Sequence, residues 1–256
     1  MNDWIQRDNP GGRFRLICLP HAGGSASIYQ QWRHYLPDDV EILRIQLPGR
    51  EQRLNEPPFT DMNSLQRALE TVLLPELTND AVPYVLFGHS MGGLIAYEWT
   101  RRRARRRERP PALLILAAIY PPHRARIQVP FLQSDADFIH HLRQRGATPP
   151  QVLGNQELMQ LLLPMLRADF TLAAGYRLDS PVPVPCPIAA LSAGDDREAG
   201  PGIMSGWQRY CVNDFSLHTF SGGHFFPRTR LIEVTQRLTE LLNNQRRATL
   251  SPSPYL

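Results

Sequence analysis

Short runs of apolar residues recur along the chain, separated by longer segments of mixed polarity. These runs cover residues 14–20, 40–48, 84–88, 112–120, 187–194 and 214–220. Most of them are continuously apolar rather than alternating, which is typical of short strands buried on both faces. We therefore expect six strands in the interior of a sheet.

The segments between these runs have a helical period. We expect helices over residues 25–36, 61–78, 91–107, 201–211 and 226–244. Strands that alternate with helices form a mostly parallel sheet that helices cover on both sides. The pattern therefore predicts an α/β protein with a central parallel sheet.

One interval breaks the alternation. Residues 121–186 contain no strand pattern but include "DADFIHHLRQRG" and "NQELMQLLLPMLRADFTLAAGY", which predict two or three amphipathic helices. The interval is too long for a simple crossover between two strands. We expect a core of residues 1–120 and 187–256, with residues 121–186 as a helical insertion.

Length and composition indicate an ordinary globular protein with one domain. The 256 residues are 42% hydrophobic and 20% charged, and a chain of this length can bury a sizeable core. No segment reads as a signal peptide or as a run of about 18 apolar residues, so we expect a cytoplasmic protein without a membrane segment. Cys18, Cys186 and Cys211 are too few for a disulfide framework or a metal cluster and are expected to be buried reduced thiols.

The net charge of +4 arises largely from one arginine-rich run, "RRRARRRE", at residues 101–108. This run continues the helix expected over 91–107, and cations at the end of a helix are favoured by its dipole. A basic patch that attracts an acidic protein or cofactor is the alternative. Nucleic acid is disfavoured as a partner, because no aromatic platform or known binding motif accompanies the charge.

The segment "VLFGHSMGGLIAYEW", residues 85–99, contains the pattern G-x-S-x-G around Ser90. The pattern ends a predicted buried strand and begins a predicted helix, which is the setting of a nucleophile elbow. A serine that only caps the helix would explain Ser90 but not Gly88, Gly92 and Gly93. We therefore predict that Ser90 is a catalytic nucleophile.

A serine nucleophile requires a base, and in this type of fold the chain order is serine, acid, histidine. His224 lies in "SGGHFFP", a glycine-rich loop between the last predicted strand and the last helix, and is our predicted base. The other histidines precede Ser90, fall at or within the insertion, or lie inside a strand: His21, His34, His89, His123, His140, His141 and His218.

The predicted acid lies in the loop after residues 187–194, where "LSAGDDRE" offers Asp195 and Asp196. The loop after residues 112–120 reads "PPHRAR" and contains no carboxylate. The acid would orient the histidine and stabilise its positive charge, and the other aspartate would be a solvated loop residue.

A tetrahedral intermediate needs two N–H donors for its oxyanion. Met91, directly after the nucleophile, is one expected donor, and Ala22 in the loop "CLPHAGGSAS" is the other. Gly23 and Gly24 permit a close approach of the backbone there. For His21 we favour a role in shaping this loop or the pocket wall over a catalytic role.

Taken together, "LICLPHAGGSASIYQQW", "LPGRE", "GHSMGG", "SAGDD" and "GGHFFP" resemble the type II thioesterases that accompany nonribosomal peptide and polyketide synthases. The resemblance covers residues 14–243 and implies an α/β-hydrolase fold whose insertion is a helical lid. The acid loop of the family reads G-x-x-D, which selects Asp196, although Ala193 replaces the glycine. The strand before the lid ends in a Ser-Gly pair in the family, whereas Ile119 and Tyr120 stand here and would narrow the pocket.

The resemblance further implies an activity, namely hydrolysis of acyl groups from the phosphopantetheine arms of acyl-carrier or peptidyl-carrier domains. It implies no metal or organic cofactor, and we expect a monomer. Apolar residues of the lid would shelter the acyl chain or simply pack on the core: Phe131, Phe138, Leu161, Leu162, Leu163, Met165, Leu166 and Phe170. A serine carboxylesterase or peptidase that acts on free small molecules is the main alternative, and a non-catalytic module that binds a carrier protein or a ligand is a second.

Overall fold

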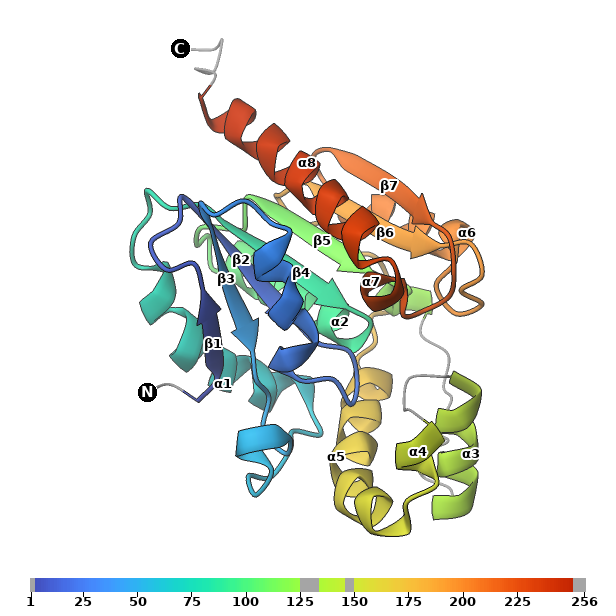
Figure 1. The fold of residues 1–256 in the computed structure, drawn as a ribbon. Coiled ribbons are helices and arrows are strands. Elements are labelled where there is room, and N and C mark those ends of the chain that lie inside the picture. The colour runs from blue at the N-terminus through green and yellow to red at the C-terminus, as the bar shows by residue number, and fades with distance from the viewer. Residues whose placement is uncertain (1–2, 125–133, 146–149, 251–256) are drawn as a thin grey trace.

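The computed structural model of the chain describes residues 3–124, 134–145 and 150–250. Seven strands form one sheet in the order β1-β3-β2-β4-β5-β6-β7 (Figure 1). All neighbouring strands are parallel except β1, which pairs antiparallel with β3. The strands are β1 Ile5–Asp8, β2 Phe14–Leu19, β3 Val40–Ile45, β4 Tyr84–His89, β5 Leu113–Ala117, β6 Ile188–Ala193 and β7 Phe215–Phe220. The predicted mostly parallel sheet is confirmed.

The two outermost strands of the sheet, β1 and β7, differ from the sequence-based expectation. The prediction missed β1, because "IQRD" is polar and only partly buried, as a short edge strand can be. The expectation that every strand is buried on both faces was wrong for β7, whose residues are mostly half-buried, because β7 pairs with β6 alone.

The helices lie close to their predicted positions but are more broken than expected. The segment predicted as a helix over 25–36 is a 3-10 helix, Ala26–His34, and the helix predicted over 226–244 is split into two. Residues 201–211 form a short α-helix followed by a 3-10 helix, Ser205–Tyr210. The α-helices outside the insertion are α1 Met62–Leu73, α2 Met91–Arg105, α6 Pro201–Met204, α7 Phe226–Thr229 and α8 Leu231–Leu250.

Two hydrophobic clusters lie on opposite faces of the sheet, as expected of strands whose successive side chains alternate. Ile17 and Leu43 belong to one cluster together with side chains of α1 and α2. Leu16 and Ile42 belong to the other, together with Trp32 and side chains of α8. The sheet is therefore covered by helices on both faces (Figure 1).

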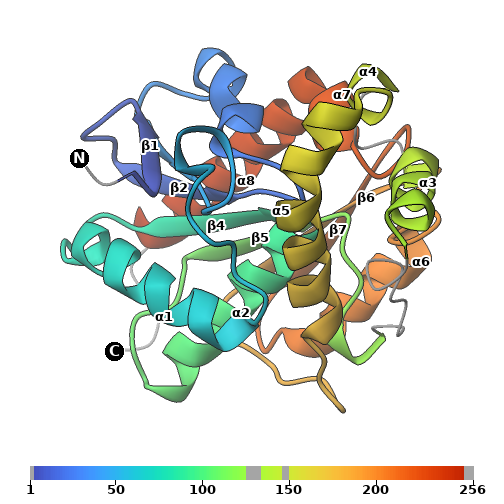
Figure 2. The same cartoon turned by 90° about the horizontal axis from the view of Figure 1, so that it is seen from below.

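Among the described residues, a short 3-10 helix, Pro122–Arg124, and three α-helices lie between β5 and β6; the α-helices are α3 Asp135–Arg145, α4 Pro150–Leu153 and α5 Gln156–Gly175. They enclose a third, smaller hydrophobic cluster that includes Phe138, Leu163, Met165 and Leu166. The helix α5 runs past the ends of the central strands (Figure 2) and also contacts α1 and α2. Leu161 is 51% exposed, and Phe131 lies outside the described residues.

None of the helices in these described ranges is both long and apolar enough to cross a membrane. Cys18 and Cys186 are buried free thiols as expected, whereas Cys211 is partly exposed.

Candidate active site

Ser90 follows β4 directly and begins the turn into α2. Its backbone has φ 53° and ψ −119°, a conformation that is strained for a residue with a side chain. The turn is tight: a Cβ atom on Gly92 would lie 2.1 Å from the carbonyl oxygen of Leu19, and one on Gly88 would lie 2.3 Å from that of Gly92. Because only glycine fits at these two positions, the pattern G-x-S-x-G is the local cause of the elbow.

The structure brings together Ser90, His224 and Asp196 from three loops at the carboxyl edge of the sheet. His224 Nε2 lies 3.0 Å from Ser90 Oγ, and His224 Nδ1 lies 2.8 Å from Asp196 Oδ2. A carboxylate at Nδ1 fixes the tautomer in which Nε2 can accept a proton from the serine hydroxyl. The arrangement can therefore activate Ser90 as a nucleophile.

Asp196, and not Asp195, contacts His224. Its second oxygen, Oδ1, accepts hydrogen bonds from the N–H groups of Glu198 at 2.9 Å and Ala199 at 3.1 Å. The Asp196 side chain is buried, whereas that of Asp195 is exposed. The backbone N–H of Asp195 donates to the carbonyl oxygen of Gly222 at 3.0 Å, so this residue ties the acid loop to the histidine loop through the main chain.

Two further histidines lie beside His224. His89 Nε2–H donates to the carbonyl oxygen of His224 at 2.9 Å, and His21 Nδ1–H donates to that of Ala22 at 3.0 Å. Burial lowers the pKa of His21 to about 4 and lowers the pKa of His89 well below its ordinary value. Both rings are therefore neutral near pH 7. No motif or spacing in the sequence predicts the contact between His89 and His224.

The two expected oxyanion donors have their N–H groups available. In the described part of the chain, the structure records no acceptor for the backbone N–H of Met91 or of Ala22. Met91 is the first residue of α2, where N–H groups have no partner within the helix. Ala22 lies in a turn closed by a 2.8 Å hydrogen bond from Gly24 N–H to the carbonyl oxygen of His21.

The arginine-rich run lies at the other end of α2 from Ser90. This helix has 15 residues, which corresponds to about 22 Å at 1.5 Å per residue. Arg101 and Arg102 are ion-paired with Glu98, and Arg103 with Glu108. Much of the charge of the run is therefore neutralised locally, and the run does not adjoin Ser90.

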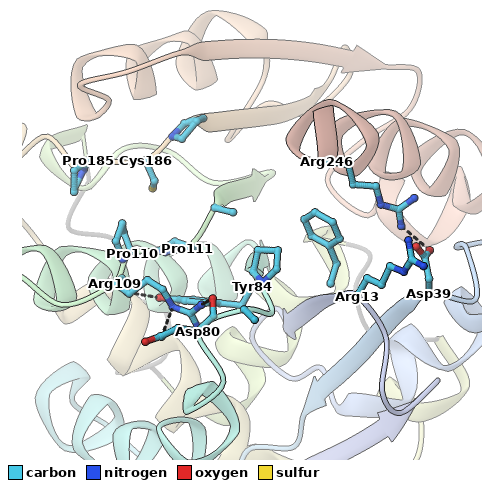
Figure 3. Close-up of a pocket in the computed structure, with 15 residues that line it drawn as sticks. Arg13, Asp39, Asp80, Tyr84, Arg109, Pro110, Pro111, Pro185, Cys186 and Arg246 are labelled. Carbon is cyan, nitrogen blue, oxygen red and sulfur yellow. Dashed lines mark hydrogen bonds and ion pairs between the residues drawn. The ribbon is translucent and has the colours of Figure 1, made fainter. Parts of the chain in front are cut away.

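A pocket of about 640 Å³ lies at the opposite edge of the sheet, where β2, β4, β5 and β6 begin (Figure 3). Two arginines that line it are already ion-paired, Arg109 with Asp80 at 3.2 Å and Arg246 with Asp39 at 2.6 Å. The pocket is thus separate from Ser90. Over the described residues, no group of three or more histidine, cysteine, aspartate or glutamate side chains is arranged to hold a metal ion.

A mostly parallel sheet flanked by helices, with an elbow serine at the end of a central strand, defines the class of α/β-hydrolases. A family model described as "Thioesterase domain" matches residues 14–242. The chain therefore belongs to the thioesterase family, whose members are hydrolases that act on thioesters.

Individual relatives agree with this family. The gramicidin S biosynthesis protein GrsT of Aneurinibacillus migulanus is 32% identical to this chain, with 98% of this chain and 97% of the relative covered. The solved type II thioesterase BorB from the borrelidin biosynthetic cluster is 34% identical, with a TM-score of 0.82 and coverage of 93% and 96%. YbtT, a type II thioesterase from the yersiniabactin NRPS/PKS pathway, is 29% identical, with a TM-score of 0.82 and coverage of 92% and 95%.

Proposed function

We propose that the protein is a type II thioesterase that hydrolyses acyl groups from the phosphopantetheine arms of carrier proteins. These carriers would belong to a nonribosomal peptide or polyketide synthase. The relatives support this substrate class, since chains similar over nearly their full length include a gramicidin S biosynthesis protein, a type II thioesterase from the borrelidin biosynthetic cluster and one from the yersiniabactin NRPS/PKS pathway. The observation that carries the chemistry is the hydrogen-bonded series Ser90, His224, Asp196.

In the first half of the reaction, Ser90 Oγ attacks the carbonyl carbon of the thioester while His224 Nε2 takes the hydroxyl proton. The carbonyl oxygen becomes an oxyanion, which the N–H groups of Met91 and Ala22 stabilise. Asp196 stabilises the imidazolium that forms. The carbon–sulfur bond then breaks, and His224 returns its proton to the departing thiolate, which leaves an acyl group on Ser90.

In the second half, a water molecule attacks the acyl-enzyme and His224 accepts its proton. Collapse of the second oxyanion breaks the bond to Ser90 Oγ, which recovers its proton from His224, and the free acid leaves. A thiol with a pKa of about 8.5 is a far better leaving group than an alcohol. The same residues therefore act faster on a thioester than on an alkyl ester of the same acid.

We also propose that residues 121–186 are a lid over this site and that residues 1–120 and 187–256 are the hydrolase core. The position of α5 beside the carboxyl edge of the sheet supports this role (Figure 2). Carrier domains would be the protein partners. The monomeric state and the cytoplasmic location stay predictions from the sequence.

The test is release of free acid from acetyl-loaded and longer-acyl-loaded carrier protein, with a p-nitrophenyl ester run in parallel. The wild-type protein should turn over the carrier thioesters faster than the ester, and Ser90→Ala should abolish both activities. Ser205→Ala, which removes an exposed hydroxyl bonded to the carbonyl oxygen of Gly202, is the matched control and should retain both. Rapid ester cleavage with the carrier thioesters left intact would instead favour a serine carboxylesterase.

A further inference from the structure

A buried carboxylate on α5 reaches the loop that contains Ala22. Asp169 Oδ2 accepts a hydrogen bond from the backbone N–H of Gly23 at 2.7 Å. Both Asp169 oxygens also accept from the Arg50 guanidinium, each at 2.8 Å. The side chains of Asp169 and Arg50 are each only 4% exposed, so this group of bonds is shielded from water.

Arg50 also binds the loop that contains Ala22. Its Nη1 donates to the carbonyl oxygen of Gly24 at 2.9 Å, and its Nε donates to that of Pro48 at 3.2 Å. Asp169 and Arg50 together thus hold the main chain at Gly23 and at Gly24. The ion pair joins three segments that lie far apart in the sequence, namely α5, the loop after β2 and the loop after β3.

These bonds fix the orientation of one peptide group. The turn from His21 to Gly24 has Gly23 at φ 78°, as the third residue of a type II turn requires. The peptide between Ala22 and Gly23 is held at both ends, its carbonyl oxygen by His21 Nδ1–H and its N–H by Asp169. If this peptide rotated, the carbonyl oxygen of Ala22 would face the Asp169 carboxylate, and the two oxygens would repel each other.

Apolar contacts place α5 on the same loops. A Cβ atom on Gly23 would lie 2.6 Å from Leu166 Cδ2, and one on Gly49 would lie 3.3 Å from Met165 Cγ. Leu166 and Asp169 are three residues apart and so share one face of the helix. The face of α5 formed by Met165, Leu166 and Asp169 is therefore docked on the two loops.

We propose that Asp169 is a positioning residue that, paired with Arg50, holds residues 21–24 in the conformation that presents Ala22 N–H to the oxyanion. The inference rests on the proposed function only in that Ala22 serves as an oxyanion donor. If Asp169 only joined α5 to the core through an ion pair, its contact with Arg50 would be sufficient. The additional bond to Gly23 N–H assigns Asp169 to the loop itself.

The experiment compares two double variants that both remove the buried ion pair. Arg50→Met/Asp169→Asn leaves an amide oxygen that can accept from Gly23 N–H, whereas Arg50→Met/Asp169→Leu offers no acceptor and has a side chain of similar size. Neither leaves an unpaired buried charge. If the leucine pair does not fold, as judged by thermal unfolding, Arg50→Met/Asp169→Ala replaces it.

Two readouts separate positioning from general stability. The first is kcat and KM for p-nitrophenyl acetate, and the second is the affinity for butylboronic acid. Boron accepts the Ser90 Oγ lone pair as His224 takes the hydroxyl proton, and the resulting tetrahedral anion places an oxygen at the oxyanion donors. We expect the leucine pair to have a kcat at least about 10-fold below that of the asparagine pair, since loss of one oxyanion donor lowers kcat by about 100-fold to 1000-fold.

The KM values of the two double variants should agree within about twofold, because substrate binding in the ground state does not use the oxyanion donors. Affinity for the boronic acid should fall in parallel with kcat. The control is Arg44→Met/Asp8→Leu, which removes a buried ion pair between β3 and β1 and should retain wild-type kcat. Equal kcat and equal boronate affinity in the two double variants would overturn the proposal, as would a wild-type protein that does not bind the boronic acid.

Failure of this inference and failure of the proposed function are distinguishable. If carrier thioesters are not substrates but the ester is, the proposed substrate class is wrong and the comparison of the double variants is unaffected. If carrier thioesters are hydrolysed and the two double variants have equal kcat and equal boronate affinity, the proposed function is supported and the proposed role of Asp169 is wrong.

Discussion

The amino and carboxyl ends of the parallel strands differ in how their polar groups are paired. At the amino edge, charged side chains such as Arg109 and Asp80 are paired with each other around a pocket. At the carboxyl edge, a strained backbone presents Ser90 to His224, and the backbone N–H groups of Met91 and Ala22 have no hydrogen-bond acceptor among the described residues. We therefore attribute the proposed reactivity to the strained backbone at Ser90 and to the available N–H donors of Met91 and Ala22 rather than to a high density of charge.

Removal of the predicted base should have the largest effect. His224→Ala leaves Ser90 without a proton acceptor, and we expect kcat for carrier thioesters to fall by about 10⁵-fold to 10⁶-fold, as for other triads. His218→Ala is the control, because His218 lies in β7 and its Nε2 bonds Ser216. Steady-state rates of acid release measure both. A comparable loss in His218→Ala would show that the contact with Ser90 does not distinguish His224 from His218 in catalysis.

The next effect distinguishes the two neighbouring aspartates. Asp196→Asn should lower kcat by about 10⁴-fold, since an amide at this position favours the wrong tautomer of His224. Asp195→Asn changes an exposed side chain and should leave kcat within about twofold. The same carrier-thioester assay measures both variants. A large loss in Asp195→Asn with an active Asp196→Asn would reverse the assignment of the acid.

Much of this arrangement is local in the sequence and could be predicted from it. All six predicted strands are present. They could be predicted because each contains an apolar run that is recognisable without knowledge of the partner strands. Ser90, Asp196 and His224 could be located because each follows a strand, and parallel strands bring the loops at their carboxyl ends to one edge. The resemblance to a family was needed to choose Asp196 over Asp195.

Contacts between distant segments could not be predicted. Arg50 and Asp169 are 119 residues apart, and neither a periodic pattern nor a motif spacing relates them. The strand β1 was missed for a similar reason, because "IQRD" has no apolar run and is defined by its pairing with β3. The last helix is interrupted at Arg230, between α7 and α8. Neither glycine nor proline stands at this position, so the sequence does not predict the interruption.

A smaller effect is expected on stability at low pH, because His21 at the carboxyl edge has a lowered pKa. Burial, followed by smaller effects of His224 and Arg228, lowers the pKa of His21 from 6.5 to about 4, although the bond to Ala22 and the Asp169 charge oppose this. The unfolded chain therefore binds more protons than the folded protein between pH 6.5 and 4. The free energy of unfolding should fall as the pH falls through this window, by up to about 3 kcal/mol for this one group.

Urea unfolding of wild-type protein and His21→Gln at pH 7.5 and pH 4.5 measures this effect. Glutamine can still donate to the carbonyl oxygen of Ala22 but cannot take up a proton. The wild-type protein should therefore lose more unfolding free energy than the variant between the two pH values. Equal losses would mean that His21 is as easily protonated in the folded state as in the unfolded state.

The smallest effect is expected at the arginine-rich end of α2. Arg105, the last residue of α2, and Arg107, which follows the end of the helix, have exposed side chains. Arg105 lies about 22 Å along the helix from Ser90 at 1.5 Å per residue. Charges at the rim of an interface change association rates and their dependence on salt, whereas charges outside it do not. Because the run does not adjoin Ser90, Arg105→Gln/Arg107→Gln should leave KM for the carrier protein within about twofold at low and moderate salt. A KM of the variant tenfold above that of the wild-type protein at low salt, with no difference at high salt, would place carrier docking on this end of the helix. The arginine-rich run would then take part in binding the carrier protein, although the reaction occurs at the other end of α2.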